Sequence, residues 1–187
     1  MQTSRPTRST ILPLVIQQEL AGTEILDHAY LLVGQGGVFA RPTIVQTVLG
    51  SCISVTMFAP RRKWGGIFHA LLPRQQDFLG RPGSNDPFRF VDSSIYALLR
   101  TFAKAGIYAP DLECKIFGGA SPLHQQADHG AGKRNTDVAL EVLQAEGLKV
   151  LSSCVGGNTG RKIFFRTDSG VVLQKRFQIT QTRMLLY

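Results

Sequence analysis

Cys52 and His69 are the two residues whose side chains could together carry out nucleophilic chemistry. A free thiol has a pKa of about 8.5 and is a weak nucleophile at neutral pH, but an imidazole that accepts its proton leaves a reactive thiolate. Gly50 and Ser51 precede the cysteine, and a bend there would point backbone N–H groups at a developing oxyanion. This pattern predicts acyl transfer through a cysteine nucleophile.

Two segments of alternating side chains would have to position this pair. Residues 47–57 and 65–73 both have the alternation of a strand, and turn-forming residues separate them, so we expect a β-hairpin. If the turn is centred just after Pro60, Cys52 lies directly opposite His69, with Cβ atoms about 4.5–5.5 Å apart. A slip of one residue would turn His69 to the other face of the sheet.

A structural interpretation of the same residues stays open. For a single cysteine and histidine in a strand protein, a buried structural thiol and a core histidine are the more common arrangement. The other cysteines, Cys114 and Cys154, lie in strand-like segments and are predicted to be small core residues. Three widely separated cysteines argue against a disulfide framework and for a reducing compartment, so we expect a cytoplasmic protein.

Several short motifs follow one another along most of the chain, from about Gly34 to Arg176. They are Leu49-Gly50-Ser51-Cys52, then Gly66 and His69 with Leu72-Pro73, then Lys115-Ile116-Phe117-Gly118-Gly119-Ala120, Arg134-Asn135, and Gly156-Gly157-x-x-Gly160-Arg161-Lys162. Each motif alone is weakly specific. Five motifs in this order and with this spacing are a strong signal. In this combination the chain resembles the chemoreceptor glutamine deamidases, the CheD family.

The resemblance implies a protein-glutamine deamidase that hydrolyses selected glutamine side chains of methyl-accepting chemotaxis receptors to glutamate and ammonia. It implies Cys52 as the nucleophile that forms a thioester, His69 as its partner, and no cofactor. It also implies association with the CheC-type phosphatase of the response regulator. The glycine pair Gly118 and Gly119 is expected near the active site, where it would leave room for the substrate chain.

Thr47 is the nearest match to the third catalytic residue of the family, a threonine shortly before the cysteine. On an unbroken strand, Thr47 and Cys52 would point to opposite faces, because their numbers differ in parity. Only a bend at Gly50 and Ser51 would bring their side chains together.

The formal net charge of +8 indicates an acidic partner, which could be a nucleic acid, an anionic membrane surface or an acidic protein. The basic residues occur in small groups, and no nucleic-acid-binding module is recognisable, so we prefer a basic surface for docking a protein. No apolar run approaches the roughly 18 residues that span a membrane, so no membrane insertion is expected. His124 and His129 lack companion ligands at useful spacing, and we predict no metal site.

The pattern of elements predicts an α/β fold: a layered sandwich of mostly antiparallel or mixed β-sheet, with two main helices packed on one side. Residues 1–20 are expected to form a tail with a first extended segment, and 21–187 a single catalytic domain. A strand at 30–33 should lead into a glycine loop at 34–37. Further elements are a helix that starts near Asp92 and ends at Gly106, a strand at 114–117, a second helix capped by Asn135 or Thr136 and ended by Gly147, a strand at 148–155, and a final hairpin at 161–176.

Two other functions stay open on the sequence. The protein could act mainly as a regulatory binding partner in chemotaxis with little catalysis, although the presence of Cys52 and His69 favours an enzyme. Nucleic-acid binding depends on the net charge alone.

Overall fold

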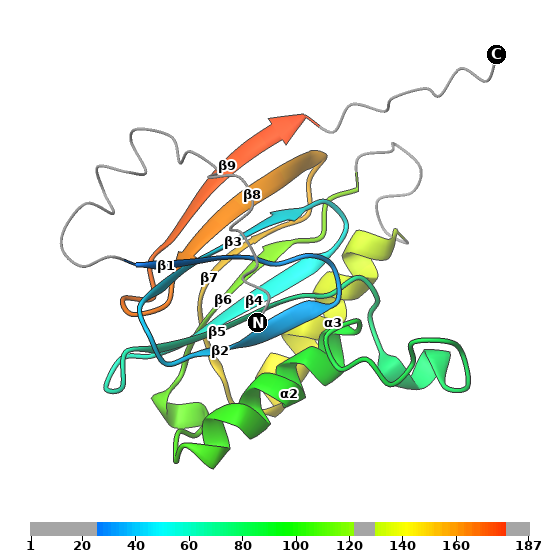
Figure 1. The fold of residues 1–187 in the computed structure, drawn as a ribbon. Coiled ribbons are helices and arrows are strands. Elements are labelled where there is room, and N and C mark those ends of the chain that lie inside the picture. The colour runs from blue at the N-terminus through cyan, green and yellow to red at the C-terminus, as the bar shows by residue number, and fades with distance from the viewer. Residues whose placement is uncertain (1–25, 122–129, 179–187) are drawn as a thin grey trace, which may run out of the picture.

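The computed structural model describes residues 26–121 and 130–178, which form three layers: two helices, a five-stranded sheet and a four-stranded sheet (Figure 1). The strand order is β2-β5-β4-β6-β7 in the larger sheet and β1-β3-β8-β9 in the smaller. The elements are β1 (Asp27–Tyr30), β2 (Gln35–Phe39), β3 (Thr43–Leu49), β4 (Ile53–Ala59), β5 (Trp64–His69), the 3₁₀ helix η1 (Gln75–Phe78), α2 (Val91–Lys104), the 3₁₀ helix η2 (Ala109–Asp111), β6 (Glu113–Gly118), α3 (Ala131–Ala145), β7 (Lys149–Val155), β8 (Thr159–Arg166) and β9 (Val172–Gln178).

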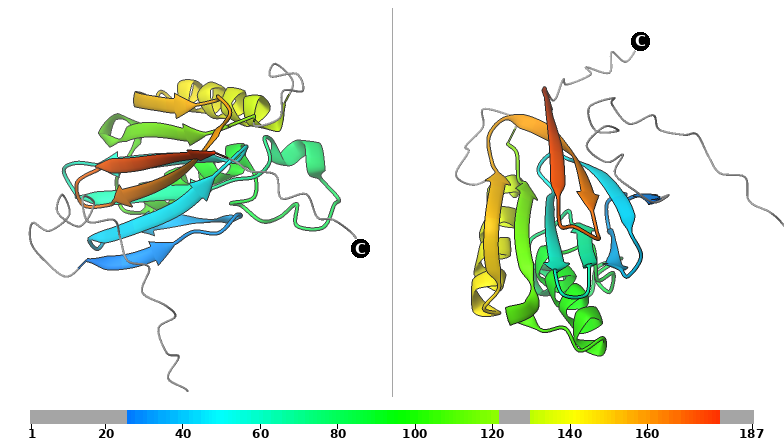
Figure 2. Two further views of the ribbon diagram at one scale, coloured as in Figure 1. Left: turned by 90° about the horizontal axis from the view of Figure 1, so that it is seen from above. Right: turned by 90° about the vertical axis from the view of Figure 1, so that its left-hand side faces the viewer.

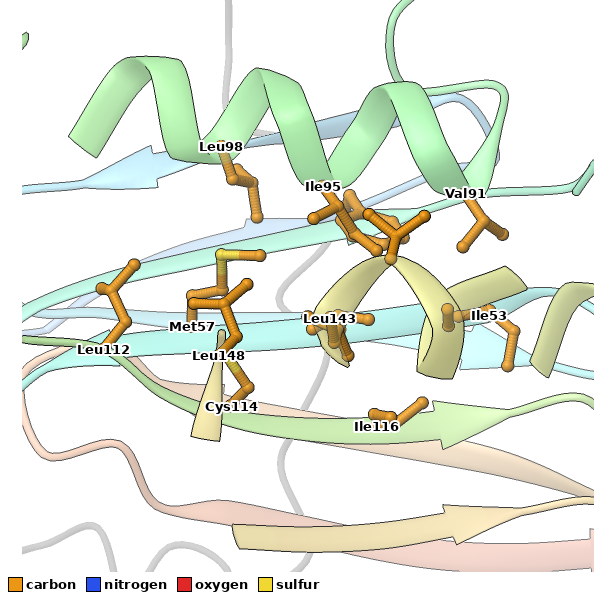
Figure 3. Close-up of a cluster of buried hydrophobic side chains, with 14 of the residues drawn as sticks. Ile53, Met57, Val91, Ile95, Leu98, Leu112, Cys114, Ile116, Leu143 and Leu148 are labelled. Carbon is orange, nitrogen blue, oxygen red and sulfur yellow. The ribbon is translucent and has the colours of Figure 1, made fainter. Parts of the chain in front are cut away.

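The five-stranded sheet is the middle layer, so its central strand β4 is buried along its whole length. Alternate side chains of β4, including Ile53 and Met57, pack against α2 and α3 in the larger core (Figure 3). The apolar residues of α2 recur at helical spacing on the side that faces this core. Burial of each such side chain contributes about 1.5–3 kcal/mol to folding.

A second, smaller core lies between the two sheets. It contains Val45 and Leu49 of β3, Ile67 of β5 and Phe165 of β8, together with Cys52 from the segment between β3 and β4. The two views of Figure 2 show the four-stranded sheet on the side of the middle layer away from the helices. Side chains that point into this space come from both sheets, which lets residues distant in sequence meet there.

The fold class is confirmed: both sheets are mixed, and both α-helices of the described chain cover one face of the larger sheet. The strand–helix–strand unit β6-α3-β7 gives a parallel pair, as expected for a crossover connection. The final hairpin is β8-β9 and is antiparallel. The second sheet was not predicted as a separate layer.

Three local predictions are wrong. The strand expected at 30–33 lies earlier in the chain, because β1 spans Asp27–Tyr30 and residues 31–33 lie outside any strand. The glycine-rich residues 34–37 do not form only a loop, because β2 begins at Gln35 and pairs with β5. A Cβ on Gly36 would lie 2.6 Å from the ring of Phe88, so this strand needs glycine to let the aromatic ring pack against it. Asn135 and Thr136 do not cap α3, which begins at Ala131 after Gly130. The predicted tail at 1–20 lies outside the described residues. So do His124 and His129, for which no metal site was predicted.

The predicted hairpin exists as β4-β5, but its register differs by two residues from the prediction. Thr56 pairs with Ile67, Ala59 with Trp64, and the isolated bridge joins Ile53 to Ala70. The turn therefore has four residues, with Lys63 in the left-handed region at φ 53°. A shift of two residues keeps every side chain on its predicted face but moves Cys52 out of direct opposition to His69.

Candidate active site

The segment Gly50–Cys52 is a bend that carries the chain from one sheet to the other. β3 ends at Leu49 in the four-stranded sheet, and β4 begins at Ile53 in the five-stranded sheet. Thr47 and Cys52 are therefore not on one unbroken strand, and the parity argument against their meeting does not apply. Both side chains point into the space between the sheets.

Cys52 and His69 lie on the same side of the five-stranded sheet. Cys52 packs in the core between the sheets, and His69 shares a face of β5 with Ile67 of that core. The bridge between Ile53 and Ala70 makes Cys52 and His69 diagonal neighbours. Diagonal neighbours have Cα atoms about 7–8 Å apart, within reach of a long or aromatic side chain.

Thr47 bonds the ring of His69 across the two sheets. Thr47 Oγ1 lies 2.8 Å from His69 Nδ1 and donates to the carbonyl oxygen of Leu31 at 2.9 Å. A hydroxyl has one hydrogen, so with Leu31 receiving it, Thr47 must accept from Nδ1–H of the ring. This network assigns the tautomer of His69 that has an unprotonated Nε2. Nε2 is buried and has no hydrogen-bond partner among the described residues.

Burial determines the charge state of the pair. Desolvation raises the pKa of the Cys52 thiol, an effect opposed by the residue's own backbone N–H. Desolvation also lowers the pKa of His69, against the opposing effect of the Leu31 carbonyl. Both shifts favour the uncharged forms of the thiol and the imidazole over a thiolate and an imidazolium. The arrangement suits an imidazole that accepts the thiol proton only as the sulfur attacks.

The carbonyl groups of the bend are held by residues from two other elements. The N–H of Ala120 donates to Gly50 O at 2.8 Å, and the N–H of Gly119 donates to Cys52 O at 2.9 Å. Nδ2 of Asn135 donates to Ser51 O at 3.0 Å. With all three carbonyls bonded, the bend has a fixed backbone.

Gly118 and Gly119 allow this close approach, and their expected role of leaving room for a substrate chain stays a prediction. Gly118 has φ 113°, and a Cβ on it would lie 2.1 Å from Cys52 O. Gly119 has φ 65°, and its Cβ would lie 2.3 Å from Thr136 Oγ1. Neither position accepts a side chain without moving the bend or α3.

The N–H groups of Ser51 and Cys52 donate to no oxygen in the part of the chain that the structure describes. They belong to the same bend as the thiol, so they are available to an oxygen atom that develops charge next to the sulfur. The expected bend at Gly50 and Ser51 is present, and the role of its N–H groups at an oxyanion stays a prediction.

The other two cysteines have different surroundings. Cys114 is fully buried, as predicted, and burial raises its pKa to about 12. Cys154 is only partly buried, contrary to its predicted place in a core, and its Sγ accepts from Gln174 and Arg176 at 3.2 Å each. Burial raises the pKa of Cys154, but bonds from Arg161, Arg176 and Gln174 outweigh this effect and bring it to about 7.

Sequence reasoning assigned no role in the site to three groups near the bend, although Asn135 and Arg161 stand in the motifs that carry the resemblance. The carbonyl of Leu31 has no side-chain signature, and Asn135 resembled a helix cap. Arg161 is buried, and its guanidinium donates to Gly118 O at 3.1 Å and Gly156 O at 2.6 Å. Its position in a glycine-rich motif was the only available signal. The described residues contain no cluster of metal-ligating side chains.

No helix among the described residues is long and apolar enough to cross a membrane. A family model described as CheD chemotactic sensory transduction matches residues 71–176. A probable chemoreceptor glutamine deamidase CheD 2 of Geobacter sulfurreducens is 46% identical over 157 residues, covering 83% of this chain and 94% of that protein. A probable chemoreceptor glutamine deamidase CheD of Maridesulfovibrio salexigens is 42% identical over 162 residues, covering 82% and 94%. These matches extend over most of both chains, and on this evidence the chain belongs to the CheD family.

Proposed function

We propose that this protein deamidates glutamine side chains of chemotaxis receptors through a thioester on Cys52. The names of the relatives support the receptor as substrate. The observation that carries the chemistry is the bond between Thr47 and His69, because it leaves the basic Nε2 of the ring on the side of the sheet that holds the thiol. The reaction needs no cofactor.

In the first half of the reaction, Nε2 of His69 accepts the thiol proton as Cys52 Sγ attacks the carbonyl carbon of the glutamine amide. The N–H groups of Ser51 and Cys52 stabilise the oxyanion of the tetrahedral intermediate. The C–N bond breaks as His69 returns the proton to the leaving nitrogen, which departs as ammonia. The product of this half is a thioester.

In the second half, His69 Nε2 takes a proton from water, and the resulting hydroxide attacks the thioester carbon. The C–S bond breaks, the sulfur recovers the proton from His69, and the substrate leaves as glutamate. Thr47 keeps Nδ1 protonated throughout and stabilises the imidazolium that forms in each half.

Burial of the pair favours a side-chain amide over a main-chain peptide bond as substrate. Cys52 is 9% exposed and His69 is 4% exposed, so only a slender group can reach them without a large movement of the sheets. The amide of glutamine stands at the end of two methylene groups and meets this requirement. A peptide bond carries chain on both sides and needs an open cleft.

Mass spectrometry of a receptor cytoplasmic fragment after incubation tests the proposal. Each conversion replaces an amide NH₂ with OH and adds about 1 Da, with one ammonia released. Cys52→Ala should abolish both signals and leave the fold intact. Undiminished conversion by Cys52→Ala would rule out this assignment.

Association with a CheC-type phosphatase, with or without catalysis, stays a prediction. A pull-down with that phosphatase, compared between the wild type and Cys52→Ala, separates a docking role from deamidation. The cytoplasmic location and the absence of nucleic-acid binding also stay predictions.

A further inference from the structure

Asn135 is a fully buried side chain of α3 that bonds two segments of the site at once. Its Nδ2 donates to Ser51 O at 3.0 Å and to Leu71 O at 2.9 Å. The side chain has 0% exposure. Both hydrogens of the amide nitrogen are therefore used, one on each segment.

The two segments are those that carry the thiol and the imidazole. Ser51 immediately precedes Cys52, and Leu71 follows His69 by two residues. The regular β4-β5 ladder ends at the pair of Thr56 with Ile67, and beyond it the strands are joined only by the isolated bridge between Ile53 and Ala70. The region nearest the site thus has little pairing of its own, and Asn135 adds a link across it from a third element.

The requirement at this position is for two donors. Both acceptors are backbone carbonyls, and an aspartate of the same shape has no hydrogen to give them. Oδ1 of Asn135 is buried without a hydrogen-bond partner among the described residues, which costs free energy. A side chain present only to fill space would be apolar and avoid that cost. The buried amide therefore points to a function for its nitrogen, which makes both bonds.

We propose that Asn135 is a positioning residue that holds Cys52 and His69 at their working separation. The inference depends on the proposed function for its kinetic consequence, because a displacement of about 1 Å between reacting groups can reduce a rate about a hundredfold. Both bonds of Asn135 Nδ2 go to backbone carbonyls, so in this proposal it acts through the two segments and not on the reacting atoms.

The test compares Asn135→Ala with Val142→Ala. Val142 lies on the same helix, about two turns further along, and is buried in the core with the helices, away from both carbonyls. Both changes truncate a buried side chain of α3. Asn135→Leu, which keeps the volume and adds no charge, serves if the alanine variant does not fold.

Two readouts are measured at temperatures where all variants are folded. With a receptor fragment, Asn135→Ala should lower kcat by roughly ten- to a hundredfold and change KM less than about twofold, whereas Val142→Ala should keep the wild-type kcat. In hydrogen exchange, which needs no substrate, the amides of Ile53 and Ala70 should exchange about tenfold faster in Asn135→Ala and be unchanged in Val142→Ala.

The outcomes separate the two ideas. If Asn135→Ala shows faster exchange at Ile53 and Ala70 but the wild type releases no ammonia, the positioning role of Asn135 is supported and the proposed deamidase activity is rejected. An active wild type with unchanged kcat and unchanged exchange in Asn135→Ala and Asn135→Leu would overturn the positioning role. A loss confined to KM would overturn it as well, since it would indicate a substrate contact.

Discussion

The hydroxyl of Thr47 on β3 and the ring of His69 on β5 are joined across the two sheets by a hydrogen bond of 2.8 Å. The bond connects the layers at the position where the chain bends toward Cys52. Because the same hydroxyl donates to Leu31 O, it also determines which ring nitrogen carries the proton.

Thr47→Val should reduce kcat/KM by about ten- to a hundredfold, because the ring loses the acceptor that fixes its tautomer and orientation. Valine has nearly the shape of threonine, so the packing between the sheets is kept. Thr47→Ser restores the hydroxyl and should recover most of the activity. Ammonia release under steady-state conditions measures both. Full activity in Thr47→Val would remove Thr47 from the catalytic group.

The pH dependence of kcat/KM reports the ionisation of the free enzyme. His69 must be neutral to accept the thiol proton, and burial lowers its pKa. Activity should therefore persist through pH 6.5 and fall only below it, since the ordinary histidine value is about 6.5. Because the pKa of His69 is lower in the folded protein than in the unfolded chain, the unfolded chain binds the proton more readily. The stability that this group contributes is therefore present above the ordinary value of about 6.5 and is lost as the pH falls from there through the lower folded-state pKa. An acid limb centred above about 7 would contradict the assignment.

Iodoacetamide should alkylate Cys154 before Cys52 at neutral pH. The pKa of Cys154 is lowered to about 7 and its side chain is partly exposed, whereas burial raises the pKa of Cys52. Peptide mapping after a short pulse distinguishes the two. Cys154→Ser should leave a protein whose remaining reactivity rises only at alkaline pH. Rapid labelling of Cys52 near pH 7 in that variant would show a resting thiolate, contrary to the neutral pair.

Gly118→Ala should destabilise the fold by about 2 kcal/mol or more and lower activity more than tenfold. The added Cβ would meet Cys52 O at 2.1 Å in a backbone conformation that favours glycine, so the bend must move. Gly37→Ala is the matched control, because a Cβ there meets nothing within 4 Å. Urea unfolding and deamidation assays measure the two effects. Equal behaviour of the two variants would contradict the role assigned to the close approach.

Alternating side chains predicted most of the strands, and apolar residues at helical spacing predicted the two helices and the α/β class. They did not predict β2, the second sheet as a separate layer, or the change of sheet at Gly50–Cys52. That bend depends on bonds from Ala120 and Asn135, which are distant in sequence, and a local pattern carries no record of them. The role of Asn135 could not be predicted for the same reason. Its residue type suggested a helix cap, but its hydrogen-bond partners lie in two segments distant in sequence.

The predicted register of the β4-β5 hairpin was wrong by two residues, and because this number is even, the error had a limited effect. A two-residue shift keeps Cys52 and His69 on one face, so the predicted pairing of thiol and imidazole survives as a diagonal relationship. The turn residues could not determine the register, since the sequence between Ala59 and Trp64 is compatible with both a two-residue and a four-residue turn. Gly118 and Gly119 lie next to the bend because only glycine tolerates both their dihedral angles and their neighbours, while their predicted role of leaving room for a substrate chain stays a prediction.

Trapping the acyl-enzyme tests the central claim most directly. Enzyme in excess is mixed with a receptor peptide that contains one target glutamine, quenched in acid within the first turnover, and weighed intact. The account predicts a species equal to enzyme plus peptide minus about 17 Da, the mass of the ammonia lost on thioester formation, with the adduct mapped to Cys52. Turnover of the peptide without any adduct on Cys52, or an adduct that persists in Cys52→Ala, would contradict it.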